Sequence, residues 1–158
     1  EIVVVIFLNL VGQTILAYIS VFSFGFILNI PRKTLNRAGI VGASAWLIYE
    51  LVFVLTQHLL DKNWRIVLGT LLASTVIGVM SLSMSRAQKV PVLIYNIPGI
   101  FPLVPGAQAY QVVRNLVVGN REVAGQNFEL LVIIAGAIVI GFWIAEIINR
   151  LRSIKPLT

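Results

Sequence analysis

Long apolar stretches separated by short polar connectors dominate this chain of 158 residues and constrain its fold more than any other feature. Its hydrophobic fraction is 58% and its charged fraction 11%, whereas soluble domains carry roughly 45–50% apolar and about 25% charged residues. A helix needs about 20 apolar residues to cross the hydrocarbon core of a bilayer. The sequence therefore predicts an all-α, polytopic membrane protein embedded in a lipid bilayer.

We expect a single transmembrane domain over residues 1–158 with about five crossing elements. The first apolar run reaches Ile30 without a positively charged start or a small-residue cleavage site, so we interpret it as a span rather than a signal peptide. A polar loop is expected at 120–127. The predicted spans are roughly 2–29, 38–59, 64–85, a broken element at 91–118, and 128–148.

The broken element lies within 90–119, which is apolar enough for a membrane but holds Pro91, Pro98, Pro102 and Pro105. An interior proline removes a backbone donor and clashes with the preceding helical turn. We therefore expect a short run at 91–97, an unwound stretch at 98–106 and a helix at 107–118. Unwound backbone at membrane depth must face protein or water, because lipid offers no hydrogen bonds.

The basic residues favour a crossing over a re-entrant path for this element. With five crossings, eight Lys and Arg residues fall on one side of the membrane: Arg32, Lys33, Arg37, Arg86, Lys89, Arg150, Arg152 and Lys155. The positive-inside rule then places the N-terminus outside and the C-terminus in the cytoplasm of a cell (inner) membrane. Because these charges flank apolar runs, the net charge of +6 does not indicate nucleic-acid binding.

Glu50 is the most unusual single residue, as the only ionisable group between Arg37 and His58. A carboxyl near the middle of a span is costly unless it is paired, protonated or hydrated. One interpretation is a proton-coupling site, and the other is a structural carboxyl bonded to a neighbouring helix. The residues alone leave both open.

Small residues repeat along several spans. One face of the third span carries Thr70, Ser74, Gly78, Ser81 and Ser85. Such a face could line a solute path, but small residues more often let two helices pack closely. We prefer packing for this face and for the pairs Gly39/Ala43, Gly69/Ala73 and Gly141/Ala145.

The strongest motif is the segment 102–110, which reads PLVPGAQAY. A helix that begins just after Pro105 has first amides without partners, and they carry a partial positive charge. Such a helix start is suited to a carboxylate, and broken helices hold substrates in many secondary transporters. The alternative is a purely structural kink. The substrate-binding candidates are Pro105, Gly106, Ala107, Gln108 and Tyr110.

Two segments of the chain resemble the threonine/serine exporter family, in its smaller, C-terminal-type domain. They are Phe26–Leu35, which precedes the Gly39/Gly42/Ala43 helix, and Pro102–Tyr110. At this length the chain is similar to the small subunit of the split, two-component form. The resemblance implies a larger membrane partner subunit and proton-motive-force-driven export of threonine and serine. Some split pairs of the family are linked to dicarboxylates such as succinate.

Other function classes fit the sequence less well. An enzyme is not expected, because there is no HExxH or GxSxG motif, no cysteine and one histidine. No cofactor or metal is expected either. A non-transporting assembly or scaffold subunit remains the alternative, in which the substrate site lies in the partner. Self-association of the chain stays open.

Overall fold

The computed structural model describes residues 2–153, so that Lys155 of the basic set lies outside the described residues. Within these residues, four helices are long and apolar enough to cross a membrane, and a shorter apolar helix covers Leu93–Leu103. The prediction of an all-α polytopic membrane protein is therefore confirmed. The elements are α1 (Ile2–Ile27), α2 (Arg32–Leu55), α3 (Lys62–Gln88), α4 (Leu93–Ile100), the 3-10 turn η1 (Phe101–Leu103), α5 (Gly106–Val118) and α6 (Arg121–Ser153).

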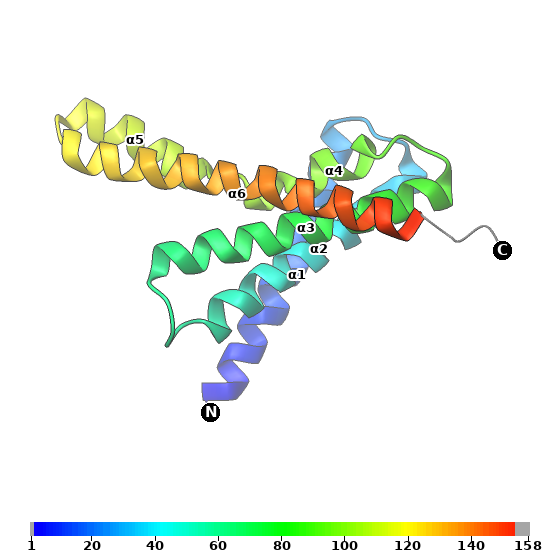
Figure 1. Cartoon of the computed structure of the whole chain (residues 1–158), viewed down its shortest axis with the longest axis horizontal. Coiled ribbons are helices and arrows are strands. Elements are labelled where there is room, and N and C mark those ends of the chain that lie inside the picture. The colour runs from blue at the N-terminus through cyan, green and yellow to red at the C-terminus, as the bar shows by residue number, and fades with distance from the viewer. Residues whose placement is uncertain (1, 154–158) are drawn as a thin grey trace.

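Helix α3 is the centre of the arrangement, because it packs against α2 on one side and α6 on another. The helices α5 and α6 form an antiparallel pair whose connected end projects beyond α1–α3, while the rest of α6 runs along α3 (Figure 1). Among the described helices, the backbone of α5 lies against α6 alone. The α1–α2 and α3–α4 connections lie at the same end as the C-terminus of α6 (Figure 1), and Gln88 donates to the carbonyl of Lys33 across that end.

The core is formed where α2, α3 and η1 meet. Its buried side chains are Val41, Ala45, Ala73, Ile77 and Leu103. Short side chains on facing helices let backbones approach closely, which is the main source of helix association when lipid is the solvent. The broken element is therefore held by protein, with Leu103 of η1 buried in this core.

The predicted packing role of Gly141 is confirmed at the α3–α6 contact. A Cβ atom on Gly141 would lie 1.9 Å from the Ser74 hydroxyl oxygen and 2.6 Å from the Leu71 carbonyl oxygen. Thr75 also donates to the Gly141 carbonyl at 3.1 Å. Part of the polar face of α3 thus packs against α6.

We expect Gly141→Ala to destabilise the protein by about 1–3 kcal/mol, the usual cost of overpacking a tight contact. The Leu71 carbonyl belongs to the backbone, so a helix and not only a side chain must shift. Gly136→Ala is the matched control, because a Cβ at that position of α6 meets nothing within 4 Å. Denaturant unfolding of the purified protein in detergent measures both, and equal stabilities would contradict the packing argument.

Two local expectations are wrong, and the first concerns Pro98. It does not end a helix, because α4 continues through it to Ile100. Pro98 is fully buried, and a Cβ atom on Gly99 would lie 3.3 Å from both Ile77 and Val41. Close packing against α2 and α3 therefore offsets the lost backbone hydrogen bond. The break in the chain lies later, at Val104 and Pro105, whose dihedral angles are not helical.

The second wrong expectation is the polar loop at 120–127, which instead forms the first turns of α6. The Asn120 side chain accepts a hydrogen bond from the Val123 amide, as an N-cap residue does. Ala124 is buried at the start of the helix. An N-cap and one buried small residue are enough to make a polar sequence helical when a partner helix lies alongside.

Candidate functional site

The break before α5 leaves two backbone amides without partners. Val104 is extended, the Gly106 amide donates to the Val104 carbonyl at 2.7 Å, and the Ala109 amide donates to Pro105 at 3.1 Å. Within the described residues, the amides of Ala107 and Gln108 donate to no acceptor. Amides at a helix start point out of its first turn and carry a partial positive charge.

These two residues line a cavity of about 190 Å³ between the broken element and three long helices. The aromatic side chains of Trp46 and Tyr49 form the α2 wall and stack on each other, with ring centroids 5.0 Å apart. The complete lining is Trp46, Tyr49, Ile66, Thr70, Pro102, Leu103, Val104, Pro105, Ala107, Gln108 and Ile134. The broken element thus faces protein and a cavity, as unwound backbone in a membrane requires.

Thr70 supplies the third donor of this cavity. Its side chain is 2% exposed, lines the cavity, and forms no hydrogen bond within the described residues. A hydroxyl that lines a cavity without a protein partner is free to donate to a ligand, so an acceptor group in the cavity could bond to Thr70. Together with the amides of Ala107 and Gln108, it makes a set of donors suited to a carboxylate.

The structure divides the five predicted substrate-binding residues into two groups. Pro105, Ala107 and Gln108 line the cavity. Gly106 and Tyr110 do not, and the Tyr110 side chain is 65% exposed. A binding role for Gly106 and Tyr110 therefore needs a ligand that extends beyond the cavity.

Glu50 lies on α2 next to Tyr49 but is not part of the cavity lining. Its side chain is half-buried and forms no hydrogen bond or ion pair within the described residues. No bond in the described chain therefore supports the interpretation of Glu50 as a structural carboxyl bonded to a neighbouring helix. The proton-coupling interpretation stays a prediction.

Trp46 and Tyr49 were not among the residues predicted from the sequence, and Thr70 was expected to be a packing residue. The aromatic residues at 46, 49 and 53 have helical spacing, which could have indicated one aromatic face on α2. Gly69 lets this face approach α3, because a Cβ there would lie 2.8 Å from the Tyr49 ring. No group of three or more His, Cys, Asp or Glu residues in the described chain could hold a metal ion.

Comparison with known proteins finds one family model, described as threonine/serine exporter (ThrE), which matches residues 13–148. An uncharacterized protein of Haemophilus influenzae is 26% identical over 147 residues, which are 88% of this chain and 47% of that protein. The chain thus spans about half the length of the curated relative it matches. No solved structure matches. The matched region includes every residue that lines the cavity.

Proposed function

Because the chain belongs to the threonine/serine exporter family, we propose that it is a membrane subunit of a secondary exporter. The substrate is threonine, serine or a similar small carboxylate-bearing metabolite. The observation that carries this proposal is the cavity of about 190 Å³, which offers the Thr70 hydroxyl and the amides of Ala107 and Gln108. Broken helices in secondary transporters use the same chemistry, since a helix N-terminus favours negative charge.

Export needs an energy source and an assembly. We propose the proton motive force as the source, with Glu50 as the coupling carboxyl beside the cavity. We also propose a larger membrane partner subunit. The Haemophilus influenzae relative supports this, because about half of its length lies outside the region it shares with this chain.

Transport into inside-out membrane vesicles tests the proposal. Radiolabelled L-threonine should accumulate in an imposed pH gradient when this chain and its larger partner are both present, and should not when either is missing. A gradient-dissipating proton carrier should abolish accumulation. Accumulation by the partner alone would reduce this chain to an assembly subunit and contradict the proposal.

We infer the orientation of the chain in the membrane from the basic residues at the two ends of the broken element. The broken element runs from the end that carries Arg86 and Lys89 to the end that carries Arg121 (Figure 1). This supports five crossings with the C-terminus in the cytoplasm. Reporter fusions after Arg121 and after Thr158 should report opposite sides, with the second cytoplasmic. Both reporters on one side, or the second outside, would contradict this topology.

A further inference from the structure

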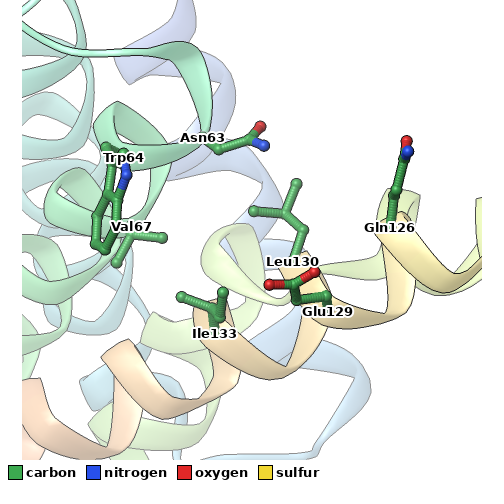
Figure 2. A pocket seen from close by; sticks show the side chains of 7 residues that line it. All are labelled: Asn63, Trp64, Val67, Gln126, Glu129, Leu130 and Ile133. Carbon is green, nitrogen blue, oxygen red and sulfur yellow. The ribbon is translucent and has the colours of Figure 1, made fainter.

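A second cavity, of about 290 Å³, lies where the first turns of α3 face α6. Figure 2 shows its side chains coming from these two helices only. The lining is Asn63, Trp64, Val67, Gln126, Glu129, Leu130 and Ile133. The two cavities are neighbours, because consecutive residues of the same helices line them. On α3, Ile66 lines the first cavity and Val67 the second. On α6, Ile134 lines the first cavity and Ile133 the second.

Glu129 gives this second cavity its charge. It has no ion pair and no hydrogen bond within the described residues. The basic residue Arg65, two positions after Asn63, is occupied elsewhere: it donates to the Phe53 carbonyl and lies 3.8 Å from the centroid of the Phe53 ring. The Glu129 side chain is exposed, and no cation of the described residues pairs with it, so its carboxylate is accessible to a ligand in this cavity.

The remaining walls suit a small organic cation. The exposed ring of Trp64 offers a π face, to which an ammonium group is attracted. The carboxamides of Asn63 and Gln126 offer oxygen acceptors. An anion such as a dicarboxylate would be repelled by Glu129, since like charges disfavour each other at close range. The two cavities thus differ in charge, because Glu129 makes the second one negative whereas no acidic residue lines the first.

We propose that the second cavity binds the ammonium group of a zwitterionic amino acid, and that Glu129 is the residue that selects amino acids over plain carboxylates. This inference rests on the proposed function, since it concerns the substrate of the same exporter. The first cavity, which offers the Thr70 hydroxyl and two backbone amides, binds the carboxylate. The amino acid occupies both cavities either at once or one after the other. Glu129 is then a specificity residue of the exporter, in the cavity between the first turns of α3 and α6.

Binding of radiolabelled L-threonine to the purified exporter, this chain with its partner, tests the inference. Glu129→Gln keeps the shape and removes the charge, so threonine affinity should fall roughly tenfold or more, as expected for a lost charge-assisted bond. The affinity for 3-hydroxybutyrate, which is threonine without its ammonium group, should not fall and should rise if Glu129 repels its carboxylate. Trp64→Leu should weaken threonine binding by a few-fold.

Glu122→Gln is the matched control, because it makes the same change on the same helix outside the cavity. If Glu129→Gln does not insert into the membrane, the inference is tested with Trp64→Leu, by comparing the affinities of that variant for threonine and for 3-hydroxybutyrate. Unchanged threonine binding in both variants would overturn the inference and leave the proposed function intact. A wild-type exporter that binds succinate more tightly than threonine would also overturn the inference, whereas one that binds neither compound would overturn the proposed function itself.

Discussion

An Ala107→Leu variant should insert normally into the membrane and lose threonine export to the level of vesicles without the exporter. The Ala107 side chain lines a cavity of about 190 Å³, and its own amide is one of the two without an acceptor. A leucine side chain would occupy this small space and cover the amides of Ala107 and Gln108. The substrate carboxylate would then lose both its hydrogen-bond donors and the space that it occupies in the cavity.

Ala109→Leu is the matched control, because Ala109 lies on the same helix, is exposed and does not line the cavity. Thr70→Val should have a smaller effect, since one hydrogen bond contributes about 0.5–1.5 kcal/mol and its loss weakens affinity roughly tenfold at most. Tyr110→Phe should change export little, because Tyr110 is outside the cavity. Vesicle uptake at matched protein levels measures all three, and normal export by Ala107→Leu would remove this site from the proposal.

Much of the fold was accessible from the sequence, because lipid imposes simple requirements on long helices. The apolar runs predicted α1, α2, α3 and α6. The errors lie where tertiary packing decides. Pro98 stays helical because it is buried, and no local rule reveals which neighbours bury a residue.

The candidate site was accessible only in part, for the same reason. Pro105 and the motif around it marked the start of α5, since proline acts through the local backbone. Thr70 could not be separated from Ser74 by spacing, because both lie on one face of α3. In the structure Ser74 contacts α6 at Gly141, whereas Thr70 lines the cavity. Only the packing of α3 against α6 divides that face into a packing part and an open part.

Glu50→Gln should separate transport from its energy source. Gln has nearly the shape of a protonated Glu but cannot release a proton. Glu50 forms no hydrogen bond or ion pair within the described residues, so the substitution breaks no such bond in this chain. We therefore expect normal folding and insertion. We also expect threonine to equilibrate across the membrane without accumulating when a pH gradient is imposed.

Three measurements distinguish coupling from structure at Glu50. Threonine binding to Glu50→Gln should stay within a few-fold of wild type, because Glu50 does not line the cavity. Counterflow, which needs no proton gradient, should persist, while gradient-driven uptake should be lost. Glu50→Asp, which keeps an ionisable group, should restore part of the gradient-driven uptake. If Glu50→Gln retains full gradient-driven uptake, the carboxyl is not the coupling group. If Glu50→Gln instead lowers the stability of the protein, the carboxyl group of Glu50 has a structural role, because Gln keeps the shape of the side chain and removes only its ionisable group.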